Sequence, residues 1–336
     1  MNKDSETKTI LIVDDVPENI DLLADILNTK YITKAAISGE KALKILKSGA
    51  KIDLALLDIN MPSMDGYELC MRIKKDTKLQ RIPVIFITAS NENQDEIKGF
   101  DVGGVDYITK PVNPAIVLRR VKTHLSLVHM DELQKTSLLV IQQLGKAAEF
   151  KDNETGLHVI RMSHYSRIIA EKLSNAHEWT NLVFRASPMH DVGKIGVPDN
   201  ILLKPGPLND NEWKIMRRHP RMGYQIIGGH DSKLLKLASE IALSHHEKWN
   251  GTGYPGGLKG DEIPLSGRIV AIADVFDALT TKRPYKEAWA VERAIDHIKK
   301  ESGSHFDPEL VPLFLSSMGE VLAVRDQWGE PETKAE

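Results

Sequence analysis

The hydrophobic pattern of this chain changes character about a third of the way along it. Over roughly the first 120 residues, short apolar runs alternate with segments whose apolar residues recur every three to four positions. Continuous short runs predict buried strands, and the wider spacing predicts amphipathic helices. The predicted strands include residues 10–13, 52–57 and 83–88, and the predicted helices include residues 18–27, 39–46 and 67–75. This alternation predicts an α/β, doubly wound, parallel, five-stranded sheet whose functional site lies at the carboxyl ends of the strands.

The rest of the chain has a helical pattern. Between residue 113 and about residue 143 there is no glycine and no strand-like run, and the apolar residues at helical spacing are Ile116, Leu118, Val121, Leu125 and Val128. A stripe of this spacing can form a coiled-coil seam, so we expect a homodimer; the repeat breaks at Glu132, and packing against its own domain is the alternative. Beyond residue 140 helical periodicity dominates, which predicts an all-α domain. The expected organisation is a first domain over 1–124, a helical linker over 125–143 and a second domain over 144–336.

Composition narrows the classes of protein that remain. The chain has 336 residues with 44 basic and 47 acidic side chains, and its net charge of -3 gives no electrostatic reason to expect a nucleic-acid partner. Its apolar stretches are shorter than the roughly 20 residues that cross a bilayer, and the N-terminus lacks the apolar region of a signal peptide. We therefore expect a cytoplasmic protein without membrane insertion. Cys70 is the only cysteine, which excludes internal disulfides. All 12 histidines lie from His124 onward, so the two parts of the chain differ in chemistry.

Polar side chains stand at the ends of the predicted strands. Asp14 and Asp15 follow the first strand, Asp58 follows the third, Thr88 ends the fourth, and Lys110 follows the fifth. Three neighbouring carboxylates repel one another unless a hard cation lies among them, and oxygen ligands suit Mg²⁺. Lys110 could neutralise phosphoryl oxygens and Thr88 could donate a hydrogen bond to them. Taken singly, each residue is equally well explained as an ordinary polar residue at a strand end.

Together these residues resemble the receiver domain of bacterial two-component response regulators, over about residues 8–124. The matching positions are Asp14-Asp15, Asp58 followed by Asn60-Met61-Pro62, Thr88-Ala89, Tyr107 and Lys110-Pro111. The resemblance implies a flavodoxin-like fold in which Asp58 accepts a phosphoryl group from a cognate sensor histidine kinase. It further implies that the three aspartates and the Asn60 carbonyl hold Mg²⁺, and that Thr88, Tyr107 and Lys110 form the switch.

The second part of the chain carries a set of histidines and carboxylates. They are Glu154, His158, His190, Asp191, His219, His245, His246 and Asp274. Glu154 and His158 are four residues apart and would share one face of a helix, and adjacent pairs such as His190-Asp191 could bridge two ions. Nitrogen and oxygen ligands without sulfur suit transition metals, and eight ligands exceed the need of one ion. We therefore predict two or three ions, with iron or manganese ahead of zinc or nickel.

A glycine-rich stretch at residues 251–256 satisfies the spacing of a dinucleotide-binding loop, but no strand precedes it and a proline-bearing loop follows, so we reject that function. His190-Asp191 together with Gly253-Tyr254-Pro255 instead resembles the HD-GYP phosphodiesterases, a branch of the HD metal-dependent phosphohydrolases. The resemblance covers about residues 140–325. It extends through residues 154–158, 190–194, 219–220, 245–247, 274–280, 283–286 and 305–308.

The resemblance implies an HD-type helical fold and a site in which all eight residues hold metals. It places Arg283 and Lys286 on the substrate phosphate, and Gly253, Tyr254 and Pro255 in the substrate-binding loop. The implied substrate is cyclic di-GMP, hydrolysed to linear pGpG; whether hydrolysis continues to GMP stays open.

Asp191 and Lys194 are the expected catalytic residues. Lys194 lies three positions after Asp191, so its ammonium could stabilise developing charge or protonate the leaving oxygen; a surface ion pair with Asp191 is the alternative. Two other functions stay open. One is a module of weak activity that senses cyclic di-GMP or docks diguanylate cyclase (GGDEF) proteins. The other is a hydrolase of a different cyclic dinucleotide, such as cyclic GMP-AMP.

Overall fold

The computed structural model of the chain describes residues 7–89, 93–152, 156–174, 176–282 and 287–329. The chain divides into two compact units, with the division between Lys135 and Thr136. None of the helices in the described ranges combines the length and the apolar character needed to span a membrane.

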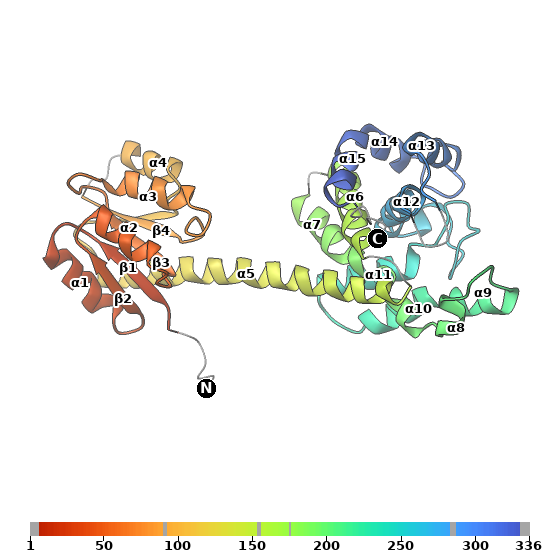
Figure 1. Cartoon of the computed structure of the whole chain (residues 1–336), viewed down its shortest axis with the longest axis horizontal. Helices are drawn as coiled ribbons and strands as arrows, with labels where there is room; N and C mark the ends of the chain where they lie inside the picture. The colour runs from red at the N-terminus through yellow and green to blue at the C-terminus, as the bar shows by residue number, and fades with distance from the viewer. Residues whose placement is uncertain (1–6, 90–92, 153–155, 175, 283–286, 330–336) are drawn as a thin grey trace, which may run out of the picture. The chain divides into compact units, whose positions relative to one another are not determined.

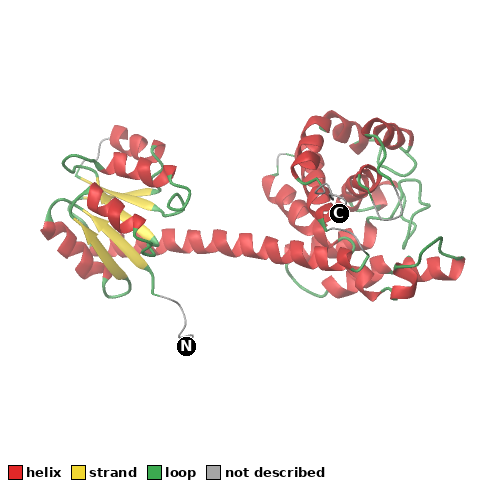
Figure 2. Ribbon diagram, viewed as in Figure 1, coloured by secondary structure: helices red, strands yellow, loops and turns green. Residues whose placement is uncertain are grey.

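The first unit is built on one parallel sheet. Its strands are β1 (Thr9–Val13), β2 (Ile32–Ala36), β3 (Leu54–Asp58), β4 (Val84–Thr88) and β5 (Asp106–Thr109). They lie in the order β2-β1-β3-β4-β5, and every neighbouring pair is parallel (Figures 1 and 2). This is the strand order of flavodoxin-like sheets, so the predicted fold class of the first domain is confirmed.

Helices cover both faces of this sheet. They are α1 (Pro17–Leu27), α2 (Gly39–Lys47), α3 (Gly66–Lys75), α4 (Asn93–Asp101) and α5 (Pro114–Phe150). The side chains of β1 alternate between the two cores that result: Leu11 and Val13 pack against α2 and α3, whereas Ile10 and Ile12 pack against α1 and the start of α5, and all four are fully buried.

The long helix α5 extends beyond the predicted stretch, which ended at about residue 143. The helix continues through Gly145 to Phe150. A Cβ atom at position 145 would collide with the carbonyl oxygen of Pro188. The glycine is therefore required by close packing, and this benefit outweighs its low helix propensity.

The second unit is helical, as predicted, and the part of it that the structure describes contains no strand. Its longer helices are α6 (Leu157–Leu173), α7 (His177–Ala186), α10 (His219–Ile227), α11 (Lys233–Ser244), α12 (Leu265–Thr280), α13 (Val291–Lys300) and α15 (Met318–Gln327). The shorter ones are η1 (Ser187–Met189), η2 (Val192–Gly196), α8 (Asp199–Leu202), α9 (Asp210–Met216), η3 (Gly260–Glu262) and α14 (Leu310–Ser316). Its core centres on Tyr165, Phe276 and Phe314, whose rings meet edge to face.

Candidate functional site

An acidic pocket lies at the carboxyl edge of the sheet in the first unit. Asp14 and Asp58 are buried, and both contact the Lys110 ammonium, whose Nζ lies 2.9 Å from Asp14 Oδ2 and 2.6 Å from Asp58 Oδ1. Asn19 also donates to both Asp14 oxygens at 3.0 Å. With Asp15, these carboxylates bring three oxygen ligands within 4.8 Å of one another. The pocket therefore has the donor set of a Mg²⁺ site.

In this pocket, burial and hydrogen bonding act in opposite directions on the pKa values of Asp58 and Lys110. Burial raises the pKa of Asp58 above its ordinary value, although the Lys110 hydrogen bond acts in the opposite direction. Burial alone would lower the pKa of Lys110, but its hydrogen bonds to Asp58 and Asp14 raise it on balance. Lys110 is therefore held as a cation beside the expected phosphoacceptor.

Two of the expected switch residues lie together. Thr88 ends β4, Tyr107 lies in β5, and both line one small hollow with Phe86 and Phe100. The Arg120 guanidinium from α5 lies 5.4 Å from the Tyr107 ring centroid. Asn60 is exposed just beyond Asp58.

The second unit gathers its histidines from separate helices. His158 is near the start of α6, and His190-Asp191 joins η1 to η2. His219 begins α10, His245-His246 follows α11, and Asp274 lies within α12. Close packing allows this convergence, because a Cβ at Gly193 in η2 would collide with the His219 carbonyl oxygen.

Asp191 is at the centre of this cluster. Its Oδ1 lies 3.2 Å from His219 Nε2 and 3.4 Å from His245 Nε2, while its Oδ2 lies 3.4 Å from His190 Nε2. Nearby, Asp274 Oδ1 lies 3.4 Å from His158 Nε2. The ligand atoms fall into two groups, in each of which they lie within 4.8 Å of one another: one is Asp191, His219, His245 and His246, and the other is Glu149, His158 and His190. The two oxygens of Asp191 face different groups.

The residues in the cluster fit bound metal ions. Asp191 Oδ1 and the Nε2 atoms of His190, His219 and His245 are buried and have no hydrogen-bond partner among the described residues. Buried polar atoms without partners are costly, and four converging ones indicate a role in metal coordination. Each of these histidines uses its other nitrogen on a backbone carbonyl: Nδ1 lies 3.1 Å from Ser187 O in His190, 2.8 Å from Met216 O in His219 and 3.1 Å from Ala242 O in His245. This fixes each ring with Nε2 toward the cluster.

The charges of the cluster perturb one another. Burial opposes ionisation of Asp191, but the cation of Lys194 and the neighbouring His190 outweigh it and hold its pKa well below the usual range. Burial and the neighbouring His245 lower the pKa of His246, and burial lowers that of His245. Both imidazoles are therefore held in the neutral form, which is the form that binds metals.

Lys194, one of the two expected catalytic residues, lies beside the cluster. Its Nζ is 3.0 Å from Asp191 Oδ2, 2.8 Å from Asp152 Oδ2 and 3.7 Å from Glu149 Oε2. Only 12% of its side chain is exposed, which makes a simple surface ion pair a poor description.

Three predicted site residues, Glu154, Arg283 and Lys286, lie outside the described residues. For Glu154, the spacing argument assumed one helix through residue 158. The helix that carries His158 begins only at Leu157, after Gly156, which has a left-handed φ of 70°. The helix that carries His158 therefore does not extend back through Gly156, and the predicted shared helix over residues 154–158 is wrong.

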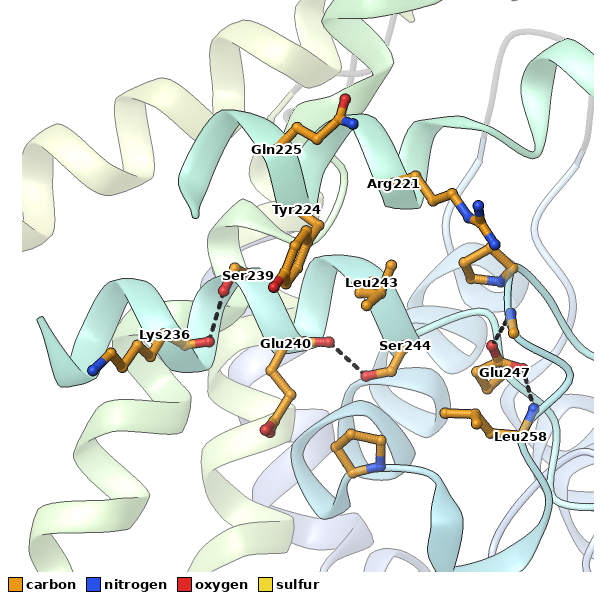
Figure 3. A pocket seen from close by; sticks show the side chains of 13 residues that line it. Arg221, Tyr224, Gln225, Lys236, Ser239, Glu240, Leu243, Ser244, Glu247 and Leu258 are labelled. Carbon is orange, nitrogen blue, oxygen red and sulfur yellow. Dashed lines mark hydrogen bonds between the residues drawn. The ribbon is translucent and has the colours of Figure 1, made fainter. Parts of the chain in front are cut away.

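The glycine-rich loop is next to the cluster. The Tyr254 ring centroid is 4.8 Å from that of His246 and 6.3 Å from that of His219, and its N–H donates to the His246 carbonyl. Glu247 holds the far side of the loop, because its carboxylate accepts from Gly256 N at 2.6 Å and Leu258 N at 3.1 Å (Figure 3). A groove of about 690 Å³ lies between α10 and α11, next to Glu247, and none of the predicted metal ligands lines it.

Sequence analysis missed several residues around the cluster. Glu149 is 1% exposed, and a carboxylate oxygen of it lies within 4.8 Å of a ring nitrogen of His158 and of His190. It lies in the last turn of α5, where no motif marked it. Asp277 contacts both His158 and Arg161. Asp277 and Arg161 lie three residues after Asp274 and His158, so the same helical spacing could have revealed them.

Comparisons with known proteins agree with both halves of this description. A response regulator receiver domain matches residues 10–122, and an HD domain matches residues 130–310. The chain therefore belongs to the HD-domain family, in an arrangement with an N-terminal receiver domain.

The individual relatives are bacterial signalling enzymes. A probable cyclic di-GMP phosphodiesterase of Vibrio cholerae is 41% identical over 97% of this chain and 81% of its own length. A cyclic di-GMP phosphodiesterase response regulator of Xanthomonas campestris is 36% identical over 83% of this chain and 79% of its own. A 3'3'-cGAMP-specific phosphodiesterase of Vibrio cholerae is 45% identical, but over 58% of this chain and 38% of its own length.

Proposed function

We propose that this protein is a response regulator that hydrolyses cyclic di-GMP to pGpG, and onward to GMP, at a centre of two or three transition-metal ions. The observation that carries the proposal is the position of Asp191, whose two oxygens face two separate groups of histidines. A carboxylate in this position could help to hold two ions, and two-metal sites are typical of phosphodiester hydrolysis. We further propose Glu154 as a ligand of this centre, together with the seven described residues that the resemblance assigned.

The chain's own residues have separate tasks in this reaction. When bound, ions of this kind lower the pKa of water and neutralise phosphate oxygens. Lys194, oriented by Asp152 and Asp191, can donate a proton or a hydrogen bond to the leaving oxygen. Tyr254 presents an aromatic ring beside His246, where a purine base could stack. Arg283 and Lys286 supply two cations for the two phosphates of the substrate.

The substrate choice rests on the extent of similarity. The two relatives named for cyclic di-GMP align with most of this chain, receiver included, whereas the relative named for cyclic GMP-AMP aligns with little more than the helical unit. Cyclic GMP-AMP stays the second candidate substrate, because the relative named for it is 45% identical over its aligned residues, compared with 41% and 36% for the two relatives named for cyclic di-GMP. A purely sensory module is less favoured, since the described ligands converge with buried donor atoms toward one another.

Product chromatography tests the proposal directly. Full-length protein loaded with Fe²⁺ or Mn²⁺ is incubated separately with cyclic di-GMP and with 3'3'-cyclic GMP-AMP. We expect pGpG to form faster from cyclic di-GMP than any linear product forms from the mixed dinucleotide. Faster cleavage of cyclic GMP-AMP would favour the second candidate, and no cleavage of either by metal-loaded protein would favour a sensory module.

The receiver half is proposed as the regulatory input. Asp58 would accept the phosphoryl group from a sensor histidine kinase while Asp14, Asp15 and the Asn60 carbonyl hold Mg²⁺. Lys110 contacts both Asp14 and Asp58. Its ammonium therefore lies where it could stabilise the oxygens of a phosphoryl group on Asp58. GGDEF proteins are proposed as further partners through the loop at Gly253-Tyr254-Pro255.

A homodimer through α5 is also proposed, but on other residues than those first expected. Val121 is buried in the receiver's own core, and Leu118 and Leu125 pack against it, so the alternative of self-packing accounts for them. Farther along α5, at near 3.5-residue spacing, apolar side chains are at least half exposed: Leu127, Met130, Leu133, Val140 and Leu144. Leu133→Glu should shift the mass in light scattering to that of a monomer, whereas Lys135→Glu on the same helix should not. A monomeric wild-type protein would contradict the dimer.

A further inference from the structure

One ligand of the cluster is held differently from the others. The Nδ1 atoms of His190, His219 and His245 lie against backbone carbonyls, whereas that of His158 lies 2.8 Å from the carboxylate oxygen Oδ2 of Asp277. A carboxylate is a stronger acceptor than a carbonyl, so it fixes the ring more firmly and makes the opposite nitrogen a better metal donor.

Asp277 is itself held in place on both oxygens. Arg161 Nε donates to Oδ1 at 2.7 Å and its terminal nitrogen donates to Oδ2 at 2.8 Å. Thr281, the residue that follows α12, donates to Oδ2 at 3.3 Å. Asp277 is fully buried and Arg161 is 1% exposed, so the forked ion pair is shielded from water and has one geometry.

The two helices arrange an inner and an outer residue in the same way. On α12, Asp274 faces His158 Nε2 and Asp277 faces His158 Nδ1. On α6, His158 is followed three residues later by Arg161, which reaches the same Asp277. Because residues three apart share a helix face, the packing of α6 on α12 presents both nitrogens of His158 to carboxylates.

We infer that Asp277, held by Arg161, is the positioning residue for one metal subsite, that of Glu149, His158 and His190. It accepts the Nδ1 proton of His158 and so keeps the Nε2 lone pair directed at the subsite. The other subsite, with His219, His245 and His246, does not depend on it. This inference rests on the metal centre proposed above but not on the identity of the substrate.

The competing explanation is a buried ion pair that only stabilises the fold. The two roles differ in which ions they affect. Loss of an outer partner of a metal ligand typically weakens metal binding by about 10- to 100-fold. A positioning role confines that loss to one ion, whereas a purely structural role leaves the affinities unchanged or lowers them all together.

Titration of the metal-free full chain with Mn²⁺ separates these outcomes without any dinucleotide present. Asp277→Asn keeps the shape of the side chain and removes its charge. We expect one Mn²⁺ site to weaken by about 10- to 100-fold while the remaining site or sites change less than about threefold. The matched control is Asp307→Asn, since Asp307 is an equally buried partner of an arginine, Arg268, that contacts none of the described ligands. It should lower the melting temperature without altering Mn²⁺ binding.

A double-mutant cycle adds a readout that a structural role would not change. In a His158→Ala background, Asp277→Asn should cause no further loss of Mn²⁺ affinity, because it acts through that ring. Unchanged binding in the single variant, equal weakening of every site, or additive losses in the cycle would each overturn the inference. If metal-free Asp277→Asn does not fold, Arg161→Lys is judged by the same criteria, and failure of both to fold would establish the structural role instead.

Discussion

The acidic pocket of the receiver and the histidine cluster of the helical unit are two solutions to the problem of keeping ionisable groups close together. In the pocket, Lys110 bridges Asp14 and Asp58, so a cation supplied by the chain balances two carboxylates. In the cluster, Lys194 contacts Asp191 and lies 3.7 Å from Glu149, and three buried imidazole nitrogens have no hydrogen-bond partner among the described residues. The first site therefore pairs its carboxylates with a lysine of the chain, whereas the second gathers buried donor atoms that suit metal ions. This difference fits a regulatory input in one unit and a catalytic centre in the other.

Removal of transition metals should have the largest effect and should act on one unit only. Ligand that binds the folded state at 100 times its dissociation constant adds about 2.7 kcal/mol of stability, so loss of each ion should lower the melting temperature of the helical unit by roughly 5–10 °C. All five tryptophans lie from Trp179 onward, so their fluorescence reports this unit alone. Phosphodiesterase activity should fall more than about 1,000-fold, beyond the 10- to 100-fold cost of losing an outer partner.

The control is the same melt after Fe²⁺ or Mn²⁺ is added back, which should restore both temperature and turnover. A tryptophan transition that does not move with metal would mean that the cluster is complete by itself, and the contrast between the two sites would disappear.

The two sites also differ in how far the sequence could reveal them. The pocket follows from alternation, because Asp14, Asp58 and Thr88 each end a strand of a parallel sheet, and such ends meet at one edge. No comparable rule brings together His158, His190 and His219, which lie on separate helices whose packing angles the pattern does not encode. Their convergence was expected only from the resemblance to a family.

Packing also explains the residues that sequence analysis missed or misjudged. Glu149 belongs to the cluster because α5 continues past Gly145, and that continuation depends on a close contact with Pro188 that no local signal records. The helix assumed to join Glu154 to His158 starts after both Glu154 and Gly156. Local periodicity predicted which elements exist, whereas tertiary contacts decided where two of them begin and end.

Substitution of Lys194 should give the next largest effect and tests whether this cation beside the cluster has a chemical task. Lys194→Ala should lower kcat by about 100-fold with little change in KM, as expected for a donor that acts mainly in the transition state. Metal content should stay at the wild-type level, because no metal ligand is removed. The matched control is Lys204→Ala, since Lys204 forms a partly exposed ion pair with Glu212 in the same unit, 2.6 Å from its carboxylate. It should leave kcat unchanged.

A normal kcat in Lys194→Ala would make the lysine a simple partner of Asp152 and Asp191. Loss of metal in the same variant would instead show that its charge is needed to keep Asp191 ionised. Metal analysis of each preparation distinguishes these two explanations.

The smallest expected effect concerns the coupling of the two sites through α5. Asp106, which begins β5, forms an ion pair with Arg120 of α5 and lies 3.0 Å from His124 Nε2 on the same helix, and Arg120 lies over the Tyr107 ring, so these contacts join the expected switch residue to α5. Allosteric couplings are typically 1–3 kcal/mol, which corresponds to at least about fivefold in an equilibrium.

Beryllofluoride, a phosphoryl mimic, should therefore change the phosphodiesterase rate or the dimer dissociation constant of wild-type protein by about fivefold or more in the presence of Mg²⁺. Asp58→Asn should abolish this response, whereas Asp53→Asn, an aspartate of the same unit that pairs with Lys8 outside the pocket, should retain it. A response that persists in Asp58→Asn would place the phosphoryl site elsewhere. Absence of any response in wild-type protein would mean that the pocket, although complete, is not coupled to the cluster, because a ligand shifts an equilibrium only as far as it distinguishes the two states.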